Sequence, residues 1–195
     1  MICVKVIHLN TYAGNGGAGR ACKRLNKALK DAGLDSEIAV NFLFRDDPGV
    51  TDLSKGLFAK ARTAAGIITE RLFSKLYTKA VPIPFSFPVW GKDISNLKLL
   101  RSADIIHLHW INHAFLRPED LAKLSRLNKP LVWTFHDSNA FTGGCHVRYE
   151  CDHYQNECGY CPVLKDPGAN DSSHRIWLRK EEAYRHLDFT VIAPS

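Results

Sequence analysis

The chain has 195 residues, 45% of them hydrophobic, and carries a formal net charge of +6. This length suits one domain, or one domain with an appended subdomain, and the hydrophobic content can fill one core. No run of about 18 apolar residues occurs, which excludes a membrane-spanning helix. The N-terminal residues lack the charged start, the long apolar stretch and the small-residue cleavage site of a secretion signal. We therefore expect a cytoplasmic protein.

Residues 2–43 predict a β-loop-α-β unit. Strands rich in Val and Ile are expected over 2–9 and 36–43, and a helix is expected over 20–32, where Gly33 ends it. Such a unit places the two strands parallel, joined by a right-handed crossover. Because the first strand is expected to end near Leu9, the glycine-rich turn over 13–19 is predicted to be longer than the tight turn of a dinucleotide-binding fold.

Residues 45–93 predict an insertion on this α/β core. Apolar residues recur at three- and four-residue steps over 55–79, which predicts a helix, whereas the prolines over 81–90 exclude one. The helix carries six basic residues and one acidic residue, Glu70, which gives it a net charge of +5. This charge favours an anionic partner such as nucleic acid, acidic lipid headgroups or a phosphorylated substrate; a merely solvated face explains it as well.

Strands and helices continue to alternate after residue 93. We expect helices over 95–102, 118–127 and 172–186, and buried strands over 103–110, 131–135 and 189–193. This alternation predicts an α/β fold with a Rossmann-like, doubly wound parallel sheet, formed by residues 1–195 as a single domain with a Cys-rich loop over 143–162. Because Pro194 and Ser195 directly follow a predicted strand, we expect the chain to be one half of a larger protein.

The turn over residues 14–20, GNGGAGR, matches the pattern GxGxxG. Backbone amides at glycines can approach an anion closely, and a helix N-terminus favours phosphate. An NAD site would need a tighter turn and an acidic residue at the end of the second strand, where Asn41 and Phe42 stand instead. A plain turn is the other alternative. The residues predicted to contact phosphate or sugar are Gly16, Gly17, Gly19 and Arg20.

Polar and aromatic residues follow the predicted strand over 103–110. His107 and His109 project to the same side of this strand, because side chains alternate along it. We interpret His107 as a satisfied buried histidine and His109, nearer the strand end, as a functional residue. Trp110 offers a platform on which a sugar can stack, and Asn112 is a further substrate-binding candidate.

His136 and Asp137 come directly after the predicted strand over 131–135. The C-terminal ends of parallel strands face the crevice in which ligands bind. Histidine can donate a proton to a hydroxyl, or accept one from it, near neutral pH. We therefore predict a catalytic role for these two residues. The alternative is a structural histidine followed by an aspartate that caps a helix.

Four cysteines cluster after this site, at spacings that include a CxxC pair. In a chain without a secretion signal, such a cluster indicates metal rather than disulfides. Four thiolates leave no open position on a tetrahedral ion, so a bound zinc would be structural. Disulfide or redox pairing and free thiols are the alternatives, and His146 or His153 could replace one ligand. The predicted ligands are Cys145, Cys151, Cys158 and Cys161.

Together these motifs resemble the N-terminal domain of bacterial GT-B glycosyltransferases of the retaining family four. The residues that carry the resemblance are 16–20 (GGAGR), 104–110 (DIIHLHW) and 133–137 (WTFHD). The run from Phe141 through Cys161 and Pro162 is similar to a cysteine-bearing subgroup of that family.

The resemblance implies a two-domain enzyme that transfers a hexosyl group from a nucleotide-sugar to a glycan or lipid-linked acceptor, without an organic cofactor, in cell-surface polysaccharide synthesis. The N-terminal half would hold the acceptor and the C-terminal half most of the donor. The turn glycines would approach the donor diphosphate, and His136 the transferred sugar. Residues 55–90 would face the acceptor or the anionic inner surface of the cell membrane.

The family's paired-glutamate motif belongs to the C-terminal domain and does not occur in this sequence, so the chain alone is expected to be inactive. Two other functions stay open. One is an NAD-dependent oxidoreductase domain. The other is a zinc-stabilised nucleic-acid-binding module, which is disfavoured because the basic residues and the cysteines lie in separate segments.

Overall fold

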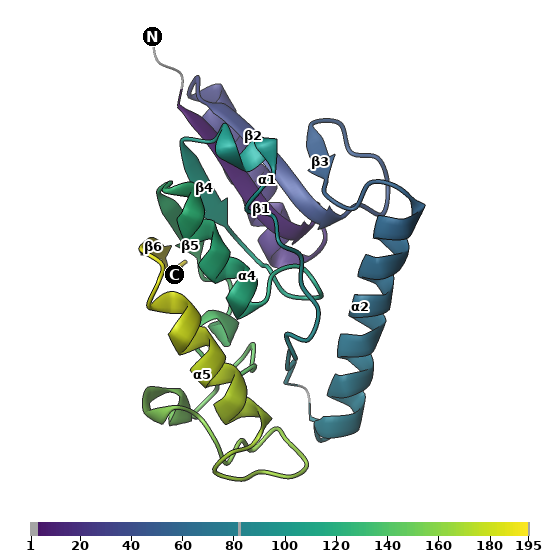
Figure 1. Ribbon diagram of the computed structural model, residues 1–195, viewed down its shortest axis with the longest axis vertical. Coiled ribbons are helices and arrows are strands. Elements are labelled where there is room, and N and C mark those ends of the chain that lie inside the picture. Colours follow the sequence, from purple (N-terminus) through teal and green to yellow (C-terminus); the bar gives the residue numbers. More distant parts are fainter. Residues whose placement is uncertain (1–3, 82, 195) are drawn as a thin grey trace.

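The computed structural model describes residues 4–81 and 83–194, which fold around a six-stranded parallel sheet (Figure 1). The strands lie in the order β3-β2-β1-β4-β5-β6, which is the order of doubly wound dinucleotide-binding folds. The prediction of a Rossmann-like α/β sheet is therefore confirmed. The strands are β1 (Lys5–Tyr12), β2 (Asp35–Phe42), β3 (Val50–Asp52), β4 (Ile105–Leu108), β5 (Leu131–Thr134) and β6 (Phe189–Ile192).

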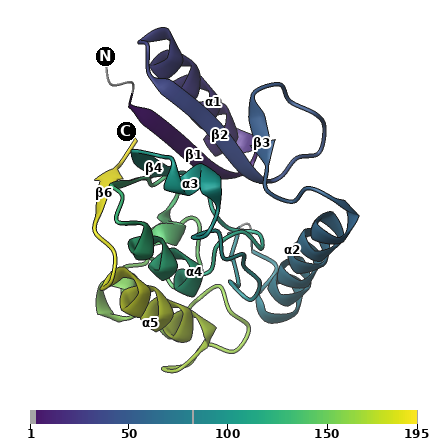
Figure 2. The same ribbon diagram turned by 45° about the horizontal axis from the view of Figure 1, so that its top comes forward.

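Helices cover both faces of the sheet (Figure 2). On one face lies α1 (Gly16–Asp31); on the other lie α3 (Lys98–Arg101), α4 (Pro118–Ala122) and α5 (Ser172–Tyr184). This split follows from the strand order, because right-handed crossovers that run in opposite directions along a sheet place their helices on opposite faces. The helix expected over 118–127 continues after α4 as a 3-10 helix, Lys123–Leu127.

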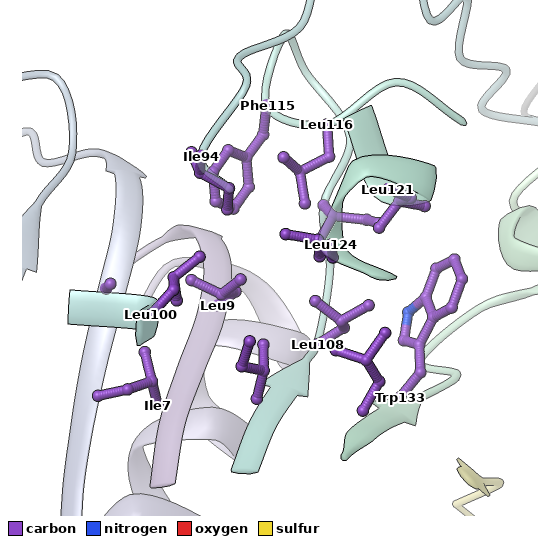
Figure 3. Packing of buried hydrophobic residues seen from close by; sticks show 14 of the residues in the cluster. Ile7, Leu9, Ile94, Leu100, Leu108, Phe115, Leu116, Leu121, Leu124 and Trp133 are labelled. Carbon is purple, nitrogen blue, oxygen red and sulfur yellow. The ribbon is translucent and has the colours of Figure 1, made fainter. Parts of the chain in front are cut away.

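The main apolar core lies between the sheet and the helices α3 and α4 (Figure 3). Ile7 and Leu9 of β1 are fully buried there, in one cluster with Leu100 of α3 and Leu124 beyond α4. Side chains alternate along a strand, so His8 points from β1 to the opposite face, on which α1 packs. The two faces of the sheet therefore differ in character: one is apolar and the other carries buried polar groups.

The first strand ends later than the sequence indicates, at Tyr12 rather than near Leu9. The backbone N–H of Thr11 donates to Trp110 O at 2.8 Å, and its hydroxyl donates to the same oxygen at 2.9 Å. Pairing with β2, where Asn10 lies opposite Val40 and Tyr12 opposite Phe42, likewise continues three residues beyond Leu9. Only residues 13–15 separate β1 from α1, so the turn is tight, contrary to the expectation. The predicted strand residues 2 and 3 lie outside the described part of the chain.

The segment over 45–93 contributes an edge strand that the sequence does not predict. β3 pairs in parallel with β2, with Val50 opposite Ile38. A strand of three half-buried residues is too short to show a periodic pattern. The expected helix is present as α2 (Leu57–Tyr77), which stands apart from the sheet beyond β3 (Figure 1). Within the two described stretches, no helix has the length and apolarity needed to cross a membrane.

Candidate functional site

The strand ends predicted to carry function meet at one edge of the sheet, beside a cavity of about 470 Å³. The residues after β4 and β5 form one wall of this cavity, and α2 and the proline-rich loop after it form the other. Ligands of doubly wound sheets bind at this edge. The polar and aromatic residues of the lining are Glu70, Arg71, Ser74, Phe85, Ser86, Trp110, His113, Asp137 and His146.

The Trp110 indole is held in place by its neighbours. Its Nε1–H donates to Asp137 Oδ2 at 2.8 Å. The Tyr12 ring lies nearly parallel to it, with centroids 6.1 Å apart, and the His113 ring meets it edge-on at 4.6 Å. A partly exposed aromatic ring with a fixed orientation offers an apolar face to a ligand while its N–H is satisfied.

Asp137 serves as a hydrogen-bond hub. Besides Trp110, it accepts from His146 Nδ1 at 2.6 Å and from the backbone N–H of Asn139 at 2.9 Å, and it caps the 3-10 turn Ser138–Ala140. Burial alone would raise the pKa of Asp137, but the bond from His146 and the other donors outweigh burial and lower it. The carboxylate therefore stays ionised, in the capping role that the sequence left as an alternative, and it orients two residues of the cavity wall.

Glu70 reaches into the cavity from α2, and the sequence did not single it out as a site residue. Its Oε1 accepts the backbone N–H of Ala114 at 3.0 Å, while Oε2 is buried and has no hydrogen-bond partner among the described residues. Burial raises the pKa of Glu70 to about 7, although backbone N–H groups oppose this shift. The buried residues Thr63, Gly66 and Ile67 precede it at helical spacing. That spacing is a signal that could have placed Glu70 on the inner face of α2.

His109 is as deeply buried as His107, although it lies nearer the strand end. Nδ1 of His109 lies 2.9 Å from Nε2 of His136, which is partly exposed. His107 Nε2 is bonded to Thr134 Oγ1 at 2.8 Å, as expected for a satisfied buried histidine. The structure therefore places His136, but not His109, where a ligand can reach it.

Three buried histidines, His8, His107 and His109, have ring nitrogens within 4.8 Å of one another, the spacing of a candidate metal site. The rings of His107 and His109 are stacked, with centroids 4.4 Å apart and planes inclined by 22°. An imidazole lone pair lies in the ring plane, so two stacked rings do not direct their lone pairs at one ion. His8 and His109 are also already bonded to each other at 3.0 Å. The geometry favours hydrogen bonding over metal binding here.

The glycine turn divides into exposed and packed residues. Gly16 and Gly17 are exposed, with no atom near the position of an added Cβ, and Arg20 is exposed beside them. Gly19 is required for packing, because a Cβ there would lie 2.9 Å from the backbone N of Gly14. The side chain of Asn15 does not cap α1. Gly16, Gly17 and Arg20 are thus free to meet an anion, whereas Gly19 holds the helix against the strand.

Asn112 does not join the cavity beside Trp110. It lines a separate void of about 20 Å³ with Asn139 and Lys180, and its carbonyl accepts the Thr11 hydroxyl at 2.8 Å. The structure thus separates one predicted substrate-binding residue from the others.

The four predicted metal ligands line a second cavity, of about 240 Å³. All four are free thiols, and the sulfurs of Cys145 and Cys161 lie 3.9 Å apart. A tetrahedral ion with Zn–S bonds of about 2.3 Å separates its ligands by about 3.8 Å, so this pair is at ligand spacing. Cys158 Sγ accepts from the backbone N–H of Gly143 at 3.2 Å. Cys151 and Cys158 do not join the pair in a set of three ligand atoms within 4.8 Å.

Neither histidine near the cysteines has both ring nitrogens free. His146 is bonded through Nδ1 to Asp137 and through Nε2 to Ser86 Oγ at 2.7 Å. His153 Nδ1 is bonded to the carbonyl of Gly159 at 3.0 Å. His146 is therefore excluded as a replacement ligand, whereas no described residue bonds to Nε2 of His153.

Comparison with known proteins gives one informative similarity. A stretch of 97 residues is 29% identical to WcaC of Escherichia coli K12, a protein provisionally named a colanic acid biosynthesis glycosyl transferase. The stretch covers 47% of this chain and 24% of WcaC, so the match spans about a quarter of that relative. No family model and no solved structure matches the chain.

The raised pKa of Glu70 gives a pH-dependent prediction. The folded state favours the protonated acid, so this contribution to stability is fully present below the ordinary pKa of 4.5 and is lost as pH rises through about 7. Glu70→Gln mimics the neutral acid at every pH. Its unfolding free energy, relative to the unsubstituted chain, should therefore rise between pH 5 and pH 8 by on the order of 2 kcal/mol.

Urea unfolding at pH 5, 6, 7 and 8 measures this difference. Glu150→Gln, at an exposed loop residue, is the control and should give a difference that is flat with pH. A flat difference for Glu70→Gln as well would contradict the raised pKa.

Proposed function

We propose that this chain is the acceptor-side domain of a glycosyltransferase that moves a sugar from a nucleotide-sugar to a glycan or lipid-linked acceptor in cell-surface polysaccharide synthesis. The observation that carries the proposal is the cavity at the C-terminal edge of the sheet, with the oriented Trp110 indole on one wall and Glu70 of α2 on the other. The similarity to WcaC supports the same class of activity.

The cavity has the chemistry that a sugar acceptor requires. An aromatic face packs against the C–H groups of a sugar ring, and a few placed polar atoms fix its orientation. Glu70 lines the facing wall, and a pKa of about 7 suits its carboxyl to exchange a proton with an acceptor hydroxyl. Ser86 and His146, bonded to each other, add further polar atoms to the lining.

The donor would lie across the same edge of the sheet, on the α1 side. Gly16, Gly17 and the uncapped first turn of α1 offer backbone N–H groups to a diphosphate, with Arg20 beside them. These groups would stabilise the departing nucleoside diphosphate, and His136 would contact the transferred sugar. Donor-binding groups of a second domain would complete the site, so we expect the 195 residues alone to be inactive. Transfer with retention of configuration and a hexosyl group as cargo are part of this proposal.

Dinucleotide binding is the second candidate, because the turn before α1 is tight after all. The end of β2 argues against it. A ribose-binding acid is expected there, but Asn41 is fully buried and donates to the carbonyl of Ala114 at 3.2 Å, and Phe42 follows. The sugar-transfer proposal therefore remains the better supported of the two.

His136 gives the first test of this function. In the complete protein, His136→Ala should lower kcat by about 100-fold or more, because the group that contacts the transferred sugar is lost. Sugar transfer from nucleotide-sugars is measured by release of the nucleoside diphosphate. His186→Ala, on an exposed histidine near the end of α5, is the matched control and should leave kcat unchanged. Equal kcat values for the two variants would refute the proposed role of His136.

We also propose that α2 lies on an anionic membrane surface, where a lipid-linked acceptor would reside. Ile68, Leu72 and Leu76 follow one another at four-residue steps on α2 and are 51–65% exposed. Arg71 and Lys75 are exposed beside them. An exposed apolar stripe flanked by basic residues is typical of a helix that lies in the headgroup region. The charge selects an anionic lipid surface over a neutral one.

Vesicle binding tests this surface. Leu72→Asp should weaken binding to vesicles that contain anionic lipid by about tenfold, because it places a charge on the apolar stripe. Leu178→Asp, an equal change at an exposed leucine of α5, is the control and should bind like the unsubstituted chain. Binding should also weaken as salt is raised. Equal affinity of both variants, or no binding to anionic vesicles at low salt, would refute the membrane contact.

We further propose that the four cysteines hold a structural zinc ion. The donor set fits, because Cys145 and Cys161 are at ligand spacing and Cys151 and Cys158 line the same cavity. Binding would require these two sulfurs to approach the pair. The buried ammonium group of Lys180, which donates to the carbonyls of Asn139 and Thr142, would offset part of the negative charge of the thiolates. The ion would tie the loop over 143–162 together without taking part in transfer.

Metal analysis tests the zinc site. The purified chain should contain one zinc per molecule, and Cys161→Ala should lose it and lower the melting temperature by several degrees, because metal binding contributes to folding. Cys22→Ala, at a buried cysteine of α1, should retain the metal. Zinc-free protein of unchanged stability would leave the cysteines as free thiols.

A further inference from the structure

A continuous row of hydrogen bonds crosses the α1 face of the sheet and ends at His136. Asn26 Oδ1 on α1 accepts from Ser36 Oγ of β2 at 2.8 Å. Ser36 Oγ lies 3.1 Å from Nε2 of His8 in β1. Nδ1 of His8 lies 3.0 Å from Nε2 of His109, and Nδ1 of His109 lies 2.9 Å from Nε2 of His136. We call these five side chains the histidine ladder.

The three imidazoles of the ladder are neutral near pH 7. Burial lowers the pKa of His8 to about 3 and that of His109 to about 2, and neighbouring imidazoles, His107 among them, add to both shifts. Burial also lowers the pKa of His136, against the opposing charge of Asp137. A neutral imidazole has one N–H and one lone pair. Each ring of the ladder must therefore donate on one side and accept on the other.

The direction of the first bond then sets the direction of all the others. Ser36 gives its only proton to Asn26, so its oxygen accepts from Nε2–H of His8. Nδ1 of His8 is left as an acceptor and takes the bond from Nε2–H of His109. Nδ1 of His109 in turn accepts from Nε2–H of His136.

The far end of the ladder is sealed from solvent, and the near end is open. His8 and Ser36 are 0% exposed, so water does not compete for their bonds. His136 is partly exposed, and no residue in the described part of the chain bonds to its Nδ1. The ladder therefore leaves one free lone pair, at the edge of the sheet where substrate is expected.

We propose that the histidine ladder holds His136 in its Nε2–H tautomer, so that Nδ1 accepts a hydrogen bond from a substrate hydroxyl. This inference rests on the proposed sugar transfer for the identity of the substrate. Asn26, Ser36 and His8 are positioning residues, which act through His136 and never touch the sugar. A site that accepts from one hydroxyl rejects a sugar in which that hydroxyl is missing, because the buried row cannot reverse to suit it.

The tautomer is measured directly by two-bond ¹⁵N–¹H correlation spectra of the chain labelled with ¹⁵N-histidine. In the unsubstituted chain, His136 should be protonated at Nε2 alone. His8→Leu removes the acceptor for His109, so His109 and His136 should both shift to a mixture of tautomers. Ser36→Ala removes a single buried oxygen, is the milder change, and should have the same effect. If His8→Leu does not fold, the spectrum of Ser36→Ala tests the proposal in its place.

Thr134→Val is the matched control. It breaks the bond to His107, on the same face of the sheet, and leaves every hydrogen bond of the ladder in place, so the His136 tautomer should be unchanged. Protonation of His136 at Nδ1 in the unsubstituted chain would overturn the proposal. A pure Nε2–H tautomer that persists in both His8→Leu and Ser36→Ala would overturn it too.

Activity separates this inference from the function on which it rests. In the complete protein, Ser36→Ala should lower kcat about tenfold with little change in KM, whereas Thr134→Val should not alter kcat. If the tautomers are as expected but the complete protein transfers no sugar, the ladder is supported and the proposed function is refuted. If Ser36→Ala has a mixed His136 tautomer but transfers sugar at the normal rate, a role of the ladder in catalysis is refuted.

Discussion

The parallel pairing of β1 with β4 is the constraint on which the rest of the structure depends. Its register sets His8 opposite His107 and Leu9 opposite Leu108, so each strand sends apolar residues to one face and histidines to the other. Because the strands are parallel, their C-terminal ends meet at one edge, where the glycine turn, Trp110 and the residues after β5 come together. A slip of one residue would exchange the two faces and place imidazoles in the apolar core. The register of β1 against β4 therefore determines both the apolar core and the candidate site.

The two faces satisfy different energetic requirements. The face covered by α3 and α4 buries aliphatic side chains, whose removal from water stabilises the fold without directional demands. The face covered by α1 buries polar groups, and an unpartnered buried polar group costs about 1–3 kcal/mol. Such a row is tolerated only when every member has a partner, which makes its geometry far more specific than that of the apolar core. The unpartnered oxygens on the described residues, Asn41 Oδ1 and Glu70 Oε2, lie away from this row.

The sequence predicts elements well and their contacts poorly, for physical reasons. Long periodic segments such as α2, and strands with apolar runs such as β4, are visible because local pattern reflects burial. β3 and the last residues of β1 depend on neighbouring strands, which a local pattern does not show. In the sequence, Glu70 stands out only as the one acidic residue of a basic helix. Its place on the inner face of α2 follows instead from its spacing to the buried residues that precede it. His8 was hidden inside a strand otherwise rich in Val and Ile, and only the sheet register brings it to His109.

On the proposed function, the two faces of α2 would link the acceptor cavity to a membrane surface. Its inner face carries Glu70 into the cavity, and its outer stripe, from Ile68 to Leu76, is apolar and exposed. A lipid-linked acceptor has its sugar and its lipid joined through a short polar headgroup. If the outer stripe rests in the headgroup region, the sugar can enter the cavity on the inner side of the same helix while the lipid remains in the bilayer. One helix about 10 Å wide would then span the distance that the headgroup must cover. On this proposal, the basic residues along α2 would attract the anionic surface and α2 would orient the cavity toward it, so that charge and cavity would serve the same substrate.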